Sequence, residues 1–425
     1  MQSDLPPSPA VDRTSTSTFV ANTYPLRVHS GQGALTALPA ELARAGVRRA
    51  MVICGRSVHT STSLVARIEE LAGARFAGVY FAMREGAPRD DVEAAALQAQ
   101  NLNADALIAV GAGSVTKAAR VVAIRMAETG PLHELATQYD ADGRGRTTRL
   151  SAIKCPIFNV LTAATTSQAR AGASIRDDAR DHQLEFFDPK TRARVVFWDA
   201  EALQTAPPFL VRSAAAMEYW WSLMNLAGSR GENPLVMASR HHAWKLSSEA
   251  LPRLANEDDW KLRVDLCAAS LLRVRDEDDG GVPLGVPSGG GPMRMHPITR
   301  AVYMLAVGLF NSPARMNQAE AFLALTAPAI RVFGDLCPDV VARLGDLLHS
   351  PTASADAVAS QFDRNMHSHG FSPREQPSTI DEDTASKVVQ YALRVFNCNA
   401  DGWMNDKQGR LRDTLASTYR PSVGP

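Results

Sequence analysis

The sequence predicts two domains: an α/β domain with a doubly wound parallel sheet, followed by an all-α domain. The chain has 425 residues, which is more than a single hydrophobic core usually organises. Short apolar runs alternate with helical patterns as far as residue 206, as is typical of parallel α/β sheets. From residue 207 to 425 the sequence instead carries long amphipathic patterns, which predict helices.

The first 19 residues are expected to form a disordered arm, because they are rich in Pro, Ser and Thr. They contain no basic segment followed by an apolar run, so we expect no secretory signal. No apolar run approaches the roughly 20 residues that span a bilayer. The five cysteines are scattered without a Cys-x-x-Cys pair, which favours reduced thiols and a cytoplasmic location.

The charges of the chain balance, with 45 Lys and Arg against 45 Asp and Glu. A protein without a basic excess has no field that attracts nucleic acid or an anionic membrane. We therefore expect a small molecule as the partner, and neither nucleic acid nor membrane.

The α/β domain, residues 20–206, is expected to alternate strands with helices in chain order. The segments are a strand at 47–54, a helix in STSLVARIEELAG, a strand in FAGVYFAM, a helix in DDVEAAALQAQNLN and a strand in ADALIAVGAG. The segment between Met126 and Lys154 is rich in Gly, Arg and Asp, which predicts a surface loop.

The turn within Leu107–Arg120, LIAVGAGSVTKAAR, predicts a phosphate-binding site. A short strand leads through Gly111 and Gly113 into an Ala-rich helix, so backbone N–H groups and the helix dipole face the turn. The two glycines allow close approach of the backbone, and Ser114 is suited to cap the helix or to bind a phosphate oxygen. A turn of this kind without a ligand remains the alternative, because many α/β proteins contain one.

The helical domain, residues 207–425, is expected to begin with LVRSAAAMEYWWSLMNLAG. Trp220 and Trp221 in this helix are expected mainly to pack against the core. The Gly- and Pro-rich segment 280–292 interrupts the helical pattern. It is either a linker between core helices or a loop that faces a cleft between the domains.

Several segments together resemble the superfamily of iron-containing alcohol dehydrogenases and maleylacetate reductases, whose fold is similar to that of dehydroquinate synthase. LIAVGAGSVTKAAR resembles the GGGSxxDxAK diphosphate loop of that family. Residues 24–33, 158–168, 188–190 and 213–221 resemble its opening strand, its PTTxxGSE loop, its Asp-Pro segment and its GMDALxHAIE helix. The resemblance implies a dehydroquinate-synthase-like fold, an NAD(P)-dependent oxidoreductase and a homodimer.

The resemblance also implies a metal held by one Asp and three His, but the sequence departs from that pattern. The Asp position matches Glu218, and the first His position matches Ser222. His296 matches a histidine that is not a ligand, and Ala314 follows Pro313 where the last ligand belongs. A carboxylate, a serine and an alanine cannot hold Zn or Fe in the usual way, so we predict no metal at the inherited site.

Polar side chains are therefore the candidates for catalysis. Glu218 and His296 are candidate proton donors, because burial can bring either pKa toward 7. Lys117 replaces the family's Asp and is a candidate to face the cofactor phosphates or a substrate carboxylate; a solvated lysine is the alternative. The candidates for substrate binding are Ser222, Tyr219, Arg300 and Arg315. The two arginines favour an anionic substrate, because a guanidinium can bind a carboxylate through two hydrogen bonds.

The resemblance implies a nicotinamide cofactor with its diphosphate over Gly111, Gly113 and Ser114. The candidates on the opposite loop are Thr162, Thr165 and Ser167. No acidic residue directly follows the strand AMVIC to hold ribose hydroxyls, whereas Arg56 is placed to pair with a 2′-phosphate. The sequence therefore favours NADP over NAD.

The alternative function is a non-catalytic or redox-neutral member of the fold that has lost dehydrogenase chemistry. Its motivation is the number of departures from the expected catalytic and cofactor groups. These departures are Lys117, Gln183, Glu218, Ser222 and Ala314.

Overall fold

A computed structural model describes residues 19–419, apart from 140–144, 180–182, 255, 258, 281–294, 312–315, 372–379, 396–398 and 400. The predicted arm therefore lies outside the described residues except for its last one, as do Ala314, Arg315 and nearly all of the Gly- and Pro-rich segment. None of the helices in the described ranges combines the length and apolar character needed to cross a bilayer.

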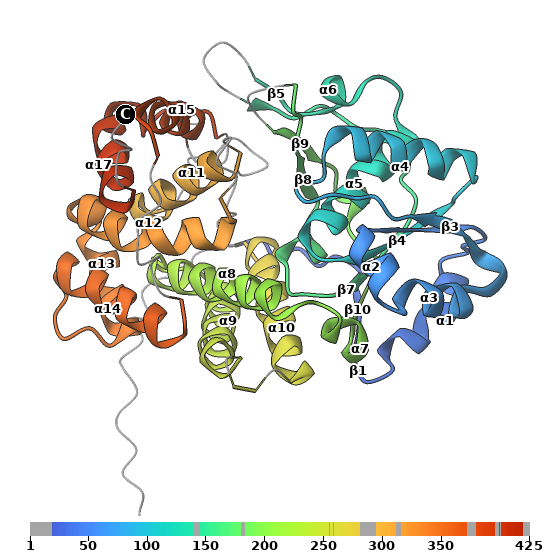
Figure 1. The fold of residues 1–425 in the computed structure, drawn as a ribbon, viewed down its shortest axis with the longest axis horizontal. Helices are drawn as coiled ribbons and strands as arrows, with labels where there is room; N and C mark the ends of the chain where they lie inside the picture. The colour runs from blue at the N-terminus through green and yellow to red at the C-terminus, as the bar shows by residue number, and fades with distance from the viewer. Residues whose placement is uncertain are drawn as a thin grey trace, which may run out of the picture.

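The first domain contains a six-stranded sheet in the order β1-β10-β7-β4-β2-β3 (Figure 1). Every neighbouring pair of strands is parallel. The strands are β1 (Arg27–Gly31), β2 (Ala50–Cys54), β3 (Phe76–Tyr80), β4 (Ala106–Gly111), β7 (Ile157–Leu161) and β10 (Val195–Asp199). The four central strands are wholly buried, as expected when helices cover both faces.

Helices pack on both faces of this sheet, because successive residues of a strand point to opposite sides. Met51 and Ile53 of β2 pack with α4 and α5, whereas Val52 and Cys54 pack on the other face with α1 and α3. The helices are α1 (Leu38–Arg44), α2 (Arg56–Ser61), α3 (Leu64–Ala72), α4 (Arg89–Asn101), α5 (Gly113–Ala127), α6 (Leu132–Leu135) and α7 (Ala200–Gln204). The predicted doubly wound α/β domain is confirmed.

The expectation of a plain surface loop between Met126 and Lys154 is wrong. This segment contains α6 and a short antiparallel pair, β5 (Gln138–Tyr139) with β6 (Gly145–Arg146). Leu132 and Leu135 are buried against the sheet domain, so apolar contacts fix a segment whose polar composition predicts a loop. A second antiparallel pair, β8 (Gly172–Ile175) with β9 (Leu184–Phe187), was not predicted.

The second domain consists of helices, as predicted. They are α8 (Pro208–Ala227), α9 (Pro234–Arg253), α10 (Trp260–Asp278), α11 (Pro297–Asn311), α12 (Gln318–Phe333), α13 (Pro338–Leu348), α14 (Ala355–Ser368), α15 (Glu382–Leu393) and α17 (Gln408–Thr418). A proline in the first turn starts α8, α9 and α13, where its missing N–H costs no helical hydrogen bond.

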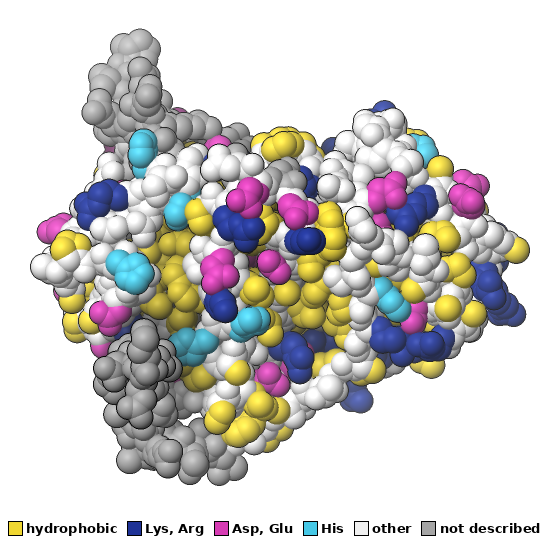
Figure 2. Space-filling model, turned by 90° about the horizontal axis from the view of Figure 1, so that it is seen from below, with side chains coloured by type: hydrophobic (Ala, Val, Ile, Leu, Met, Phe, Trp, Pro, Cys, Tyr) yellow, Lys and Arg dark blue, Asp and Glu magenta, His cyan; other side chains and the backbone are white. Residues whose placement is uncertain are grey.

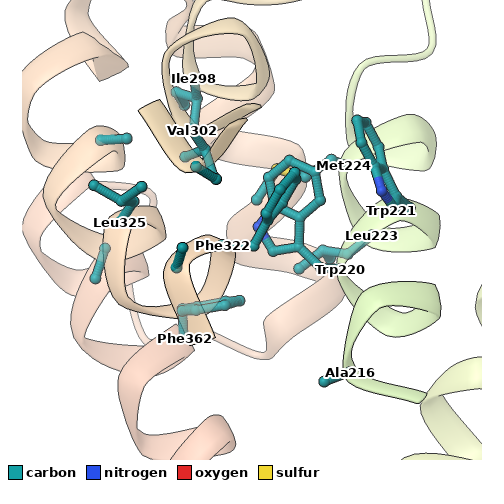
Figure 3. Close-up of a cluster of buried hydrophobic side chains, with 14 of the residues drawn as sticks. Ala216, Trp220, Trp221, Leu223, Met224, Ile298, Val302, Phe322, Leu325 and Phe362 are labelled. Atoms are coloured by element: carbon teal, nitrogen blue, oxygen red, sulfur yellow. The ribbon is translucent and has the colours of Figure 1, made fainter. Parts of the chain in front are cut away.

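The core of the helical domain surrounds Trp220 (Figure 3). Its ring packs edge-on against Phe322 and Trp221, with ring centres 4.6 Å apart in both pairs. Its indole N–H donates to Thr326 Oγ1 at 2.6 Å, which satisfies the polar atom of this buried ring. The predicted packing role of the two tryptophans is confirmed.

Helix α10 joins the two domains. It lies beside β7, β10 and α7 in Figure 1, and Cys267 on α10 packs with Leu161, Trp198 and Leu203 of the sheet domain. Residues on α10 therefore lie within reach of the loops that follow the sheet strands.

Candidate functional site

The glycine turn, residues 111–114, joins the buried strand β4 to α5. Gly111 has φ +153°, and a Cβ there would lie 2.9 Å from the Val115 side chain. The N-cap residue of α5 is Ala112, which supplies no side-chain hydrogen bond. The first N–H groups of α5 therefore lack the side-chain cap that usually satisfies them, as in helix ends that bind anions.

Ser114 does not cap this helix. Its hydroxyl oxygen instead accepts a hydrogen bond from the Gly86 N–H at 3.1 Å, so the side chain fixes the neighbouring loop. Of the two expected roles for Ser114, the structure therefore excludes capping and leaves phosphate binding as a prediction.

The loop after β7 lies directly opposite the glycine turn. A Cβ on Gly113 would lie 3.3 Å from Thr165 Oγ1, and the Thr162 N–H donates to the Gly111 carbonyl at 3.2 Å. Thr165 in turn accepts from the Ser167 N–H at 3.1 Å. The structure thus brings together five of the six residues predicted on the two sides of the cofactor.

Positive charge gathers at this turn. Arg120 is buried on α5 and donates to the Ser167 carbonyl and, at 2.7 Å, to Ser167 Oγ. Within the described ranges, no acidic side chain forms an ion pair with Arg120 or Lys117. Burial, reinforced by Arg120, lowers the pKa of half-buried Lys117 to about 8. The turn therefore combines helix N–H groups with two cations that lack a partner carboxylate, which is a suitable environment for a diphosphate.

Arg56 lies at the same edge of the sheet. It is the exposed first residue of α2, directly after β2 and Gly55. Because Cys54 at the end of β2 pairs with Val110 of β4, Arg56 and the glycine turn leave neighbouring parallel strands at their carboxyl ends. This is the edge at which open α/β sheets bind ligands.

Glu218 forms a buried ion pair that the sequence did not predict. Its Oε2 accepts from Arg273 Nη1 at 2.7 Å, and the two side chains are 5% and 4% exposed. Burial raises the pKa of Glu218, against the lowering effect of Arg273 and Arg170. Arg273 also lies over the Trp221 ring, 5.2 Å from its centre. No sequence motif could indicate this pair, because Arg273 lies on α10 and Glu218 on α8, 55 residues apart.

Ser222 lies one turn after Glu218 on α8 and is buried. Its hydroxyl has no hydrogen-bond partner, and neither has Arg273 Nε. Unpaired buried polar atoms are uncommon in proteins and call for an explanation.

His296 has a structural environment instead of the one expected for a proton donor. Its Nδ1 accepts from the Thr299 N–H at 3.3 Å, which caps α11, and its Nε2 lies 2.8 Å from Thr299 Oγ1 and 3.3 Å from the Met224 carbonyl. Burial lowers the pKa of His296 to about 4. The ring is therefore neutral near pH 7 and both nitrogens are engaged, which favours a capping role over catalysis.

Tyr219 and Arg300 face the helical core. The Tyr219 ring packs against Trp244, with ring centres 5.0 Å apart. Arg300 forms an ion pair with Asp401 and lies over the Trp403 ring. Both side chains therefore anchor the helical domain, and these contacts do not support their predicted role in substrate binding. The predicted Arg315 lies outside the described residues.

Glu218 and Ser222, at the position where the resemblance implies a metal, are a poor donor set for a divalent ion. Glu218 is held by a guanidinium, and the Ser222 hydroxyl is a poor ligand for Zn or Fe. In the part of the chain that the structure describes, no three His, Cys, Asp or Glu side chains are grouped to hold a metal.

A doubly wound sheet with an uncapped glycine turn, followed by a helical domain, is the architecture that the sequence resemblance implies. The family model for iron-containing alcohol dehydrogenases matches residues 25–200. The resemblance to this family that the sequence motifs predict is therefore confirmed over the sheet domain.

Individual proteins named as dehydrogenases or reductases are similar to this chain. The chain is 26% identical to an NAD-dependent methanol dehydrogenase of Bacillus methanolicus over 302 residues, 68% of this chain and 75% of that enzyme. It is 36% identical to maleylacetate reductase 2 of Cupriavidus pinatubonensis over 106 residues, which are 25% of this chain but only 29% of the reductase. The NADH-dependent butanol dehydrogenase A of Thermotoga maritima superposes with a TM-score of 0.75 at 15% identity, covering 95% of this chain and 100% of that one.

Proposed function

We propose that this protein is a nicotinamide-dependent oxidoreductase that interconverts a carbonyl compound and its alcohol without a metal at the inherited position. The observation that carries the proposal is the uncapped glycine turn beside Lys117 and Arg120. The family match and relatives named as dehydrogenases and reductases support an oxidoreductase. When bound, the nicotinamide supplies or accepts the hydride.

The residues at the turn have separate tasks in holding this cofactor. The free N–H groups of α5 bind the diphosphate, and Gly111 and Gly113 leave room for its approach. Arg120 fixes the Thr165–Ser167 loop against the turn while balancing phosphate charge.

Fluorescence titration with NADPH and NADH tests the proposal. We expect binding of at least one, and oxidation of the bound cofactor when simple aldehydes are added. Failure to bind either cofactor would overturn the proposal. Binding without turnover of any carbonyl compound would favour the alternative, a non-catalytic or redox-neutral member of the fold.

The preference for NADP is part of the proposal and rests on Arg56. R56S should weaken NADPH binding by about tenfold, because one charged contact to a 2′-phosphate is lost, and should leave NADH binding unchanged. R253S is a suitable control. Arg253 is exposed on α9 in the helical domain, where it pairs with Glu257. Equal loss of both cofactors in R56S would contradict this preference.

Metal independence is tested by elemental analysis of protein purified without chelator. We expect well under one equivalent of Fe or Zn and the same NADPH oxidation rate after dialysis against EDTA, because the donor set is too poor to retain either ion. Stoichiometric metal that is lost together with activity in E218A would contradict this expectation.

The remaining expectations concern assembly and location. A small-molecule substrate, a homodimer, a cytoplasmic location and no nucleic-acid or membrane partner stay predictions. On the face seen in Figure 2, basic and acidic side chains lie interspersed, in keeping with equal numbers of each.

A further inference from the structure

At the position where the resemblance implies a metal ligand, the carboxylate of Glu218 forms an ion pair with the guanidinium of Arg273. Arg273 Nη1 donates to Glu218 Oε2 at 2.7 Å, deep between α8 and α10. One turn further along α10, Glu277 forms an ion pair with Arg170 of the sheet domain. Two arginines and two glutamates thus form a cluster, named here the Arg273 cluster, whose formal charge is zero.

Three buried polar atoms of this region have no hydrogen-bond partner: Arg273 Nε, Ser222 Oγ and Arg170 Nε. Glu218 engages only Nη1 of Arg273, and Nε on the other edge of the guanidinium is buried without a hydrogen-bond partner. The Ser222 hydroxyl, one turn after Glu218, is buried and also unpartnered. A buried donor without an acceptor destabilises the folded protein, and a ligand oxygen would relieve that cost.

We propose that Arg273 takes the place of the divalent ion. Its free N–H edge and the Ser222 hydroxyl bind and polarise the carbonyl oxygen of a neutral aldehyde or ketone. An arginine suits this task because it stays charged when buried and presents several N–H donors in a fixed fork. Glu218 positions the guanidinium from its opposite edge.

The charge of the cluster sets the substrate class. Because the cluster is already neutral, the carboxylate of a substrate would add an unbalanced buried negative charge, which is costly. A neutral carbonyl oxygen adds no charge before the reaction. The group at the reacting carbon is therefore expected to be an uncharged aldehyde or ketone, in contrast to the anionic substrate that the sequence favoured.

The inference rests on the proposed function, which supplies the co-reactant. On reduction the carbonyl carbon gains a hydride from the reduced nicotinamide, and the π electrons of the C=O bond move onto oxygen. The oxygen then takes a proton from water, so carbonyl, NAD(P)H and H⁺ become alcohol and NAD(P)⁺. Arg273 keeps its own protons and stabilises the negative charge on oxygen between these events.

R273K is the test variant, because a lysine retains the ion pair with Glu218 but has no second N–H edge. S222A removes the hydroxyl without disturbing a charge. R240K is the matched control: Arg240 is buried and paired with Asp276 and Glu232 elsewhere in the helical domain. Circular dichroism and the dissociation constant of NADPH establish that each variant is folded and binds cofactor.

The first readout is turnover of propanal with NADPH. We expect R273K to lower kcat about 100-fold, and S222A about tenfold, with NADPH affinity unchanged and R240K like wild type. Retention of kcat within about threefold in folded R273K would overturn the inference while leaving the proposed function intact.

The second readout does not need turnover. Isothermal titration with isobutyramide, a neutral carbonyl compound that is not reduced, is made on protein with and without NADPH. We expect binding to wild type and R240K and its loss in R273K, whereas isobutyrate binds more weakly than the amide. If wild type binds no cofactor, the proposed function fails, and amide binding that depends on Arg273 still supports this site. Equal amide binding by R273K, or tighter binding of isobutyrate, would overturn the inference.

Discussion

At the residue scale, the charge of Lys117 is expected to depend on whether the proposed cofactor is bound. This residue replaces an acidic residue of the family loop and lies half-buried on the first turns of α5. Burial, Arg120 and Arg176 disfavour its charged form, whereas Glu85 favours that form. A cofactor phosphate would supply the missing negative charge, so binding of an anion and protonation of Lys117 should be coupled.

This coupling predicts how cofactor affinity depends on pH. The pKa of Lys117 in the free protein is about 8, so the ammonium is present below that pH and is lost as the pH rises through it. NADPH affinity should therefore fall by about tenfold between pH 7 and pH 9.5, as one charged contact disappears. Fluorescence titrations across this range check the slope.

K117M is the control for this dependence. It should bind NADPH weakly at all these pH values and show no loss between pH 7 and pH 9.5. A wild-type slope that persists in K117M would assign the titration to another group, and a flat wild-type profile would remove Lys117 from the cofactor site.

At the scale of single elements, a histidine directly precedes α11. His296 accepts from the Thr299 N–H and lies against the end of α8, where a Cβ on Gly228 would come within 2.9 Å of its ring. The neutral ring therefore serves as a cap in a closely packed corner. Protonation would remove the acceptor at Nδ1 and place a charge among buried atoms.

Acid should destabilise the protein through this cap. The pKa of His296 is about 4 in the folded protein and near 6.5 when unfolded, so the folded state binds fewer protons. The stabilisation is complete above pH 6.5 and is lost as the pH falls toward 4, with a maximum near 3 kcal/mol. Urea unfolding of wild type and H296N at pH 7 and pH 4.5 measures it.

The variant H296N keeps an N-cap acceptor but does not titrate. Its free energy of unfolding should fall less than that of wild type between the two pH values. The other titrating groups, mainly carboxylates, contribute equally in both proteins, so the difference reports on His296. Parallel losses in the two proteins would show that His296 does not contribute to the acid sensitivity.

Elements with a local pattern were predictable and those held by distant contacts were not. The central strands are continuous apolar runs, and the glycine turn is fixed by a few adjacent residues, so both follow from sequence. The strands of the pairs β5–β6 and β8–β9 have only two or four residues each, too few to show a pattern, and they depend on packing for their form. Arg273 is 55 residues from Glu218, so only the tertiary structure identifies the pair.

At the scale of the whole molecule, Gln168 ties the domains together. Its side-chain oxygen accepts from the Trp198 indole N–H at 2.8 Å within the sheet domain. Its amide nitrogen donates to the Cys267 carbonyl at 3.0 Å and to Ser270 Oγ at 2.6 Å on α10. The Arg170–Glu277 and Arg192–Asp278 ion pairs join the same two domains. The glycine turn and the Arg273 cluster are held in a fixed relation by these contacts.

Loss of the Gln168 side chain should weaken the coupling between the two domains. Q168A leaves the buried Trp198 N–H without an acceptor and opens a void, so the free energy of unfolding should fall by about 2–4 kcal/mol. Scanning calorimetry should show a lower Tm and a broader or split transition, because the two domains then unfold with less cooperativity. Q361A, which removes hydrogen bonds to Asn365 and Arg364 within α14, should change stability by less than about 1 kcal/mol. A single, unshifted transition in Q168A would mean that the apolar contacts of α10 alone couple the domains.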